Sequence, residues 1–189
     1  MSVITRHFLA TQTYGWVNNN PNDSGSNGTK ARIDYAVNLI RLGIIPYQNL
    51  IAIFPQGYSK KNPKKDNGNE SLGRNASRYF SEVSRGLNIS ILNEPLTWGT
   101  DRDVEMTMFQ VGMYLNGINR NAIGCVHFVS DPCHIQRVMI CACANCSFNT
   151  RLVFHSATTH RLPNFQRFVR EPVARLYARF IFRGMTRYT

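Results

Sequence analysis

The sequence predicts a three-layer α/β/α Rossmann-like sandwich with a mainly parallel sheet of about five strands. Short apolar runs alternate along the chain with segments in which apolar residues recur at helical spacing. Two of these runs, Asn49–Phe54 and Ala122–Val129, are largely apolar, which is typical of strands buried on both faces of a parallel sheet. Strands that alternate with helices imply right-handed crossovers and helices on both faces of the sheet.

The first half of the chain starts with a short strand at residues 5–11. Residues 12–29 are rich in Asn, Gly, Ser and Thr, which predicts a long polar loop. Apolar residues then repeat at helical spacing from Ile33 to Ile40, and Gly43 can close this helix. The elements expected next are the strand at 49–54, a helix at 70–86 and a strand at 88–92.

The second half opens with a helix that runs from Thr100 to about Leu115. Its start, Thr100-Asp-Arg-Asp103, is similar to a capping box, in which the Thr side chain accepts a hydrogen bond from a first-turn amide. The remaining expected elements are a strand at 122–129, a helix at 132–146, a strand at 151–155 and a helix at 171–182.

Length and composition fit one domain, residues 1–189, which is large enough to form a stable core without disulfide bonds or bound metal ions. Hydrophobic residues make up 43% and charged residues 17% of the chain, as in folded globular proteins rather than disordered ones. The formal net charge is +11 and the pI is about 9.9. A charge of this size favours anionic partners such as phosphates, nucleotides, nucleic acid or a membrane surface.

The five cysteines all lie between Cys125 and Cys146. An odd, clustered set does not suit a disulfide framework, so the sequence favours a reducing compartment and a cytoplasmic protein. Cys141, Cys143 and Cys146 look like a metal motif, but zinc sites usually combine one cysteine pair with a second, distant pair, and no metal is expected. No apolar run approaches the roughly 18 residues of a membrane span, so no transmembrane segment is expected.

The best candidate site is the junction after the strand at 122–129. Ser130 and Asp131 end the strand, and Asp131 followed by Pro132 suits the start of a helix. His134 and Arg137 stand three residues apart and therefore share one helical face. Arg offers a planar fork for phosphate or carboxylate, and His can transfer protons near neutral pH. The alternative is that His134 packs or caps while Arg137 pairs with a structural carboxylate. Asp131 could hold Arg137 or a ligand hydroxyl.

Other loops at the carboxyl ends of the strands contain polar or glycine residues. Thr100, Asp101 and Asp103 could bind a ligand or act as a general base near His134, and a plain helix cap would explain them equally well. Gly15 and Gly57 each follow a strand and could let a ligand approach the backbone. Neither belongs to a Gly-x-Gly-x-x-Gly or Walker motif, so a turn glycine is the simpler interpretation of each.

The C-terminal segment 151–189 has eight arginines, no lysine and a single acidic residue. Arg175, Arg179, Arg183 and Arg187 recur every four residues and predict a basic stripe on a helix around 167–187, with Leu176 and Phe180 on an adjoining apolar face. Such a stripe could bind nucleic acid or anionic lipid. A solvated outer face of a docked helix is the favoured interpretation, so nucleic acid is an alternative partner only.

The segment Phe128–Val138 resembles the Val-Thr-Ser-x-x-His-x-x-Arg-Ala motif of the YdcF-like family. It matches at His134 and Arg137, and Ser130 stands in the Thr place. The segment Glu94–Asp103 is similar to the family's Glu-x-x-Ser-x-Asn-Thr-x-Glu-Asn segment, matching at Glu94 and Thr100.

Further segments extend this resemblance over roughly residues 4–182. The helix start around Arg32 is similar to the family's Arg-Leu-x-x-Ala, and Glu70 stands where the family has Ser-Glu-Ala. Pro55-Gln-Gly57 stands where the family has Ser-Gly-Gly. The resemblance implies a Rossmann-like domain with one ligand cleft, to which Arg32 and Glu70 would contribute.

The function implied by the resemblance is poorly defined. One family member binds S-adenosylmethionine, and others are linked to the bacterial cell envelope. The leading hypothesis is therefore a cleft that binds an anionic nucleotide-type small molecule, with S-adenosylmethionine as the named candidate. A hydrolase or transferase acting on a phosphate-bearing envelope precursor, with His134 and Asp101 or Asp103 transferring protons, is the first alternative. A nucleic-acid or membrane-surface module using the C-terminal helix is the second.

Overall fold

The structure is a computed structural model of the chain. It describes residues 5–13, 15, 17–20, 22–55, 71–92, 99–118, 122–146, 149–157, 169 and 171–182. Gly57, Glu70, Arg183 and Arg187, which the sequence singled out, lie outside the described residues.

A five-stranded parallel sheet forms the middle layer of the molecule, as predicted. Its spatial order is β3-β2-β1-β4-β5, so the chain builds outward from β1 to β3 and then returns to the other side of β1. β1 and β4 run side by side from Thr5 opposite Ile123 to Thr11 opposite Val129. The strands are β1 (Thr5–Thr11), β2 (Leu50–Ile53), β3 (Ser90–Leu92), β4 (Ile123–Ser130) and β5 (Thr150–Ser156).

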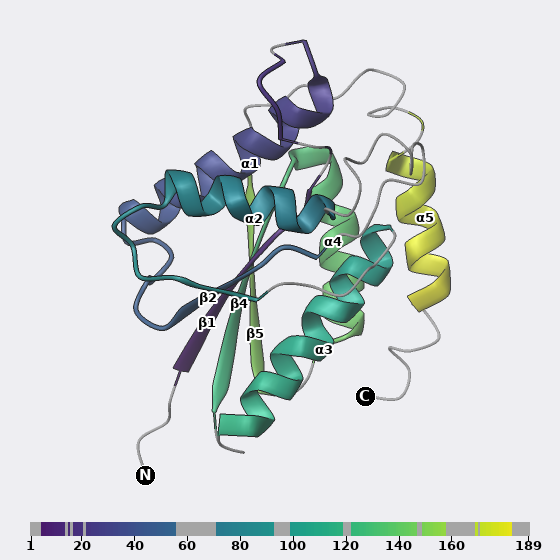
Figure 1. Ribbon diagram of the computed structural model, residues 1–189. Helices are drawn as coiled ribbons and strands as arrows, with labels where there is room; N and C mark the ends of the chain where they lie inside the picture. The colour runs from purple at the N-terminus through teal and green to yellow at the C-terminus, as the bar shows by residue number, and fades with distance from the viewer. Residues whose placement is uncertain are drawn as a thin grey trace.

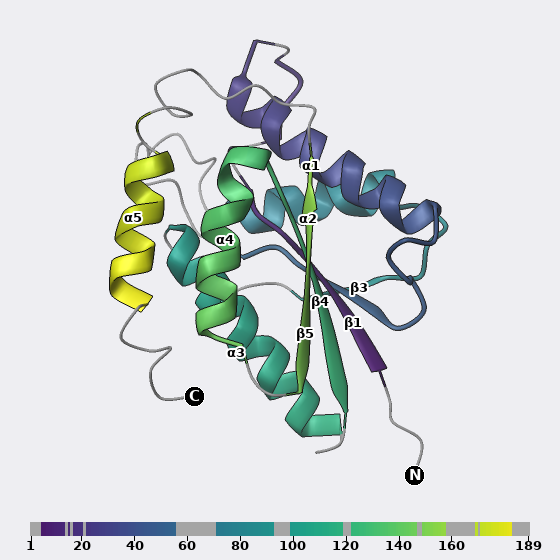
Figure 2. The same cartoon turned by 180° about the vertical axis from the view of Figure 1, so that it is seen from behind.

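Helices cover the sheet from both sides, which gives the predicted three layers (Figures 1 and 2). α1 (Ser24–Arg41) and α2 (Leu72–Val83) lie on one side. α3 (Thr100–Ile118), α4 (Pro132–Ala144) and α5 (Glu171–Phe182) lie on the other, with α5 packed on α4. This division follows from right-handed crossovers, because the chain reverses its direction across the sheet after β3.

Alternate side chains of the strands build a separate core on each face of the sheet. Phe8 and Phe128 point to the side of α3 and α4, where they join Val104, Val111 and Val138. On the side of α1 and α2, the core consists of Leu9, Val129, Ile33, Ile40, Ala76 and Phe80, among others. Burial on both faces explains why β2 is apolar throughout and why β4 is apolar at most of its positions.

Helix α1 begins at Ser24, well before the Ile33 start of the predicted helical pattern. The expected loop at 12–29 is therefore too long, and its last part is helical. Asp23 caps the helix, since its Oδ1 accepts a hydrogen bond of 3.1 Å from the Ser26 amide. Ser26 and Thr29 are buried polar residues of the first turns, and both bond to the preceding loop. Tertiary hydrogen bonds thus support a helix start that lacks an apolar pattern.

The C-terminal helix α5 docks on α4 through Ala178, which is fully buried. Arg175 donates a hydrogen bond to the Gln136 side chain of α4. Leu176 of the predicted apolar face is 65% exposed, because the docked face of the helix is the one that carries Ala178. Arg179 is exposed, as expected of an outer basic stripe. The remainder of that stripe lies outside the described residues.

Among the helices that the structure describes, none has the length and apolar character needed to cross a bilayer.

Candidate functional site

The carboxyl ends of β1 and β4 form the topological switch point of the sheet. The chain leaves these two neighbouring strands toward opposite faces, to α1 after β1 and to α4 after β4. In open parallel sheets, ligands bind in the crevice beyond such a pair of carboxyl ends. We call this end of the sheet the carboxyl edge.

Three residues expected in the site contact one another near the carboxyl edge: Thr100 at the start of α3, and His134 and Arg137 in the first turns of α4. The Arg137 Nη2 donates to the Thr100 Oγ1 over 2.8 Å and lies 2.9 Å from the His134 Nδ1. The His134 Nε2 lies 3.1 Å from the same Thr100 oxygen. We call this arrangement the Thr100–His134–Arg137 cluster. The helical spacing of His134 and Arg137 predicted their proximity, and the fold adds Thr100.

The partners of His134 assign its tautomer. A guanidinium only donates hydrogen bonds, so the Nδ1 must accept the bond from Arg137. The ring is then neutral with its proton on Nε2, which donates to the Thr100 Oγ1. Thr100 accepts twice, and its own hydroxyl proton meets no acceptor among the described residues. The cluster therefore offers a fixed positive charge and a hydroxyl donor.

Thr100 does not serve as the predicted side-chain cap of α3. Its hydroxyl is taken by His134 and Arg137, while the Asp103 amide donates to the Gly99 carbonyl over 3.0 Å. Gly99 adopts φ +96°, a conformation that glycine reaches without strain. The turn before α3 consequently frees the Thr100 side chain to face α4.

A buried ion pair lies at the base of the site. Arg32 of α1 and Asp131, the residue before α4, are 2% and 1% exposed and bond through Arg32 Nη2 and Asp131 Oδ2. Arg32 also donates to the Gln12 carbonyl after β1 over 2.7 Å. Asp131 occupies the N-cap position of α4 as predicted, but its side chain makes no capping bond. It holds Arg32 and not Arg137, because α1 brings Arg32 across the switch point.

Several buried polar atoms at the ends of β1 and β4 have no hydrogen-bond partner among the described residues. They are the Thr11 Oγ1, Gln12 Nε2, Thr13 Oγ1 and Ser130 Oγ. Each belongs to a residue that is at most 5% exposed. Leaving a buried donor or acceptor unsatisfied costs about 1–3 kcal/mol, so such atoms gather where a polar ligand can pair with them.

The two acidic residues expected to assist His134, Asp101 and Asp103, lie in the first turn of α3. The Asp101 Oδ1 accepts a bond of 3.4 Å from the Cys141 thiol of α4. Burial and the nearby Asp101 carboxylate raise the pKa of Cys141 to about 12. Asp103 is 1% exposed within α3, and its carbonyl accepts a hydrogen bond from the Thr107 hydroxyl. His134 contacts Thr100 and Arg137.

The environments of the α4 cysteines predict different reactivities. Cys141 is buried beside Asp101, whereas Cys143 is exposed on the outer side of the same helix. We expect native protein to react with iodoacetamide more than about tenfold faster at Cys143 than at Cys141, because alkylation requires an accessible thiolate. Peptide mass spectrometry measures both rates. Equal rates in the native state would contradict the burial of Cys141, and equal rates in denaturant are the expected control.

Gly15 lies on the α1 side of the carboxyl edge. Its amide donates to the Thr29 Oγ1 over 3.0 Å, and its carbonyl accepts from the same hydroxyl over 2.8 Å. These bonds tie the loop after β1 to the first turns of α1.

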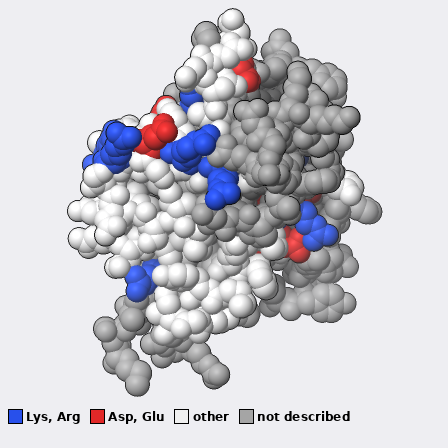
Figure 3. All heavy atoms as spheres, viewed as in Figure 1, with Lys and Arg blue, Asp and Glu red and all other residues white. Residues whose placement is uncertain are grey.

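A separate polar pocket of about 420 Å³ lies between the loop after β1 and helices α1 and α2. Lys30, Arg78 and Glu82 are among its lining residues, and none of the residues expected in the site is. On the face drawn in Figure 3, basic and acidic side chains are interspersed over α2. Mixed charges do not favour an anionic ligand, so the Thr100–His134–Arg137 cluster is the candidate site.

One group of chemically versatile side chains was not singled out from the sequence. His7, Cys125 and His127 meet on the sheet, with their nitrogen and sulfur ligand atoms all within 4.8 Å of one another. The spacing of Cys125 and His127 by two residues in a strand was the available signal, since it places both on one face. The contribution of His7 depends on the β1–β4 register, in which it lies opposite Cys125.

Comparisons of the chain with protein-family models, with curated proteins and with solved structures give no match. The resemblance to the YdcF-like family stays a prediction from the motifs.

Proposed function

We propose that this protein binds an anionic, nucleotide-type small molecule at the carboxyl edge between β1 and β4. The observation that carries the proposal is the convergence there of Thr100, His134 and Arg137 from two different helices. S-adenosylmethionine, which is cationic overall but carries a carboxylate as its anionic part, is the named candidate, because the motif resemblance points to it.

The charges around the cluster suit an anion. Arg137 lies in the second turn of α4, whose N-terminal end carries the positive end of the helix dipole. The Arg137 Nη2 donates to the Thr100 hydroxyl and lies beside the His134 Nδ1. The Asp131 carboxylate at the same helix start would repel an anion if it stood alone, but the buried ion pair with Arg32 neutralises it.

The polar atoms of the strand ends supply hydrogen bonds for the rest of the ligand. Ser130 ends β4 and Gln12 follows β1, the two strands that flank the switch point, and both are buried. Their unpartnered atoms suit the hydroxyl and amide groups of a nucleoside. In this arrangement Arg137 holds the anionic part, Thr100 donates to it, and His134 orients both through its two ring nitrogens.

Calorimetric titration of the full chain with S-adenosylmethionine, adenine nucleotides and inorganic phosphate tests the proposal. We expect at least one of these probes to bind, and Arg137→Ala to weaken its binding by about 10- to 100-fold, because a charge-assisted hydrogen bond contributes about 1.5–3 kcal/mol. The matched control is Arg102→Ala, an exposed arginine of α3 that pairs with Glu105. It should bind like the wild type.

Two outcomes would overturn the proposal. One is that no probe of the panel binds to the wild-type protein. The other is that Arg137→Ala, shown by circular dichroism to be folded, binds as tightly as the wild type and Arg102→Ala.

A further inference from the structure

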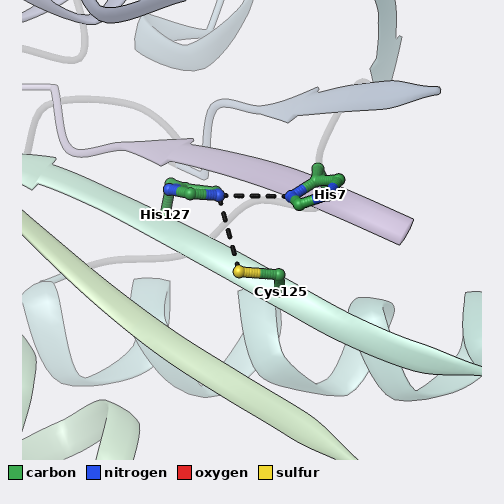
Figure 4. A group of neighbouring side chains, drawn as sticks. All are labelled: His7, Cys125 and His127. Atoms are coloured by element: carbon green, nitrogen blue, oxygen red, sulfur yellow. Dashed lines mark hydrogen bonds between the residues drawn. The ribbon is translucent and has the colours of Figure 1, made fainter. Parts of the chain in front are cut away.

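His7, Cys125 and His127 project from two neighbouring central strands onto the same face of the sheet (Figure 4). They share this face with Leu9 and Val129, which belong to the core under α1 and α2. The His7 Nδ1 lies 3.4 Å from the His127 Nε2, and the Cys125 Sγ lies 3.5 Å from that same nitrogen. Cys125 and His127 are 8% and 4% exposed.

These separations match the edges of a tetrahedral zinc site. With Zn–N bonds of about 2.0–2.1 Å and a Zn–S bond of about 2.3 Å, tetrahedral angles place two nitrogens about 3.4 Å apart, and a nitrogen and a sulfur about 3.6 Å apart. The two distances to the His127 Nε2 therefore already suit a common metal ion. The third separation, between His7 and Cys125, is at most 4.8 Å.

His155 of β5 contacts His127 on the Nδ1 side of its ring. The His155 Nε2 lies 3.1 Å from the His127 Nδ1, and the two rings are stacked with an interplanar angle of 14°. With the Nδ1 proton of His127 directed to His155, the Nε2 lone pair faces His7 and Cys125. Metal-binding histidines commonly bond in this way to a neighbour through their second nitrogen, which fixes ring orientation and tautomer.

We propose that His7, Cys125 and His127 bind a borderline-soft divalent cation of the zinc class, with His155 as a positioning residue. Two imidazoles and one thiolate are a typical donor set for such an ion, and the fourth tetrahedral position stays open to water or a ligand. The site differs from the carboxyl edge, because His127 precedes Ser130 by about three residues, or about 10 Å of strand. It also does not use Cys141, Cys143 and Cys146, the motif for which the sequence predicted no metal.

Metal binding needs both imidazoles in their neutral form and the Cys125 sulfur as a thiolate. Burial raises the pKa of the Cys125 thiol, and the charge of Arg151 on β5 opposes that rise. On binding, the Cys125 sulfur exchanges its proton for the metal and the proton passes to solvent. The resulting thiolate offsets the positive charge of Arg151 near the cation.

Titration of metal-free full chain with Co²⁺ tests the proposal directly. We expect one equivalent to produce the visible absorption of tetrahedral cobalt together with a thiolate-to-cobalt charge-transfer band, and Zn²⁺ to remove both. The Cys125→Ser variant should lose the charge-transfer band, whereas Cys143→Ser, which alters an exposed cysteine, should keep it. His155→Gln should keep the band and bind about 10- to 100-fold more weakly.

A wild-type protein that gives no thiolate-to-cobalt band would overturn the proposal, whatever the folding of the variants. A band that survives unchanged in Cys125→Ser would do the same. Because the readout is spectroscopic and uses residues outside the Thr100–His134–Arg137 cluster, its outcome is independent of ligand binding at the carboxyl edge.

Discussion

Replacing Asp131 with alanine is expected to lower the free energy of unfolding by about 3–5 kcal/mol. Arg32 and Asp131 are both almost fully buried, so the variant would leave the guanidinium in the interior without its carboxylate. Removing one member of a buried pair is costly because the remaining charge keeps its desolvation penalty and loses the attraction that offset it. Urea unfolding followed by circular dichroism measures the change.

The chain offers an exposed ion pair as a control. Arg102 and Glu105 of α3 bond over 2.6 Å, but their side chains are 70% and 45% exposed. Glu105→Ala should change the free energy of unfolding by no more than about 1 kcal/mol, since water already screens this pair. Similar losses in Asp131→Ala and Glu105→Ala would show that the Arg32–Asp131 pair is not buried as described.

Phe128→Ala should also lower the free energy of unfolding by about 3–5 kcal/mol. Phe128 of β4 is fully buried in the core beneath α3 and α4, and its ring stacks on Phe154 of β5 at a centroid distance of 5.6 Å. Truncation removes the buried ring and leaves a cavity that the rigid sheet closes only partly. The measurement is the midpoint and slope of the same urea transition.

Phe109 provides the matched control for this truncation. It lies on α3 and is 58% exposed, so Phe109→Ala should stay within about 0.5 kcal/mol of the wild type. A loss at Phe109 as large as the loss at Phe128 would contradict the orientation of α3 on the sheet.

The sequence was most informative where one physical rule governed a whole segment. Continuous apolar runs identified β2 and β4, because both faces of a central parallel strand are buried. The start of α1 was missed, since it depends on Asp23 and on hydrogen bonds from Ser26 and Thr29 to a loop rather than on an apolar pattern. The exposure of Leu176 was not predicted, since sequence periodicity cannot reveal which face of α5 meets α4.

The amino-acid pattern by itself determined the α/β class, the order of elements and the proximity of His134 and Arg137, all of which follow from local backbone geometry. The tertiary structure decided that Thr100 joins them, that Asp131 pairs with Arg32, and that His7 meets Cys125 and His127. Each of these contacts joins residues that are far apart in the sequence. Helical and strand periodicity relates residues only a few positions apart, whereas such contacts depend on strand order and register, which the sheet settles as it assembles.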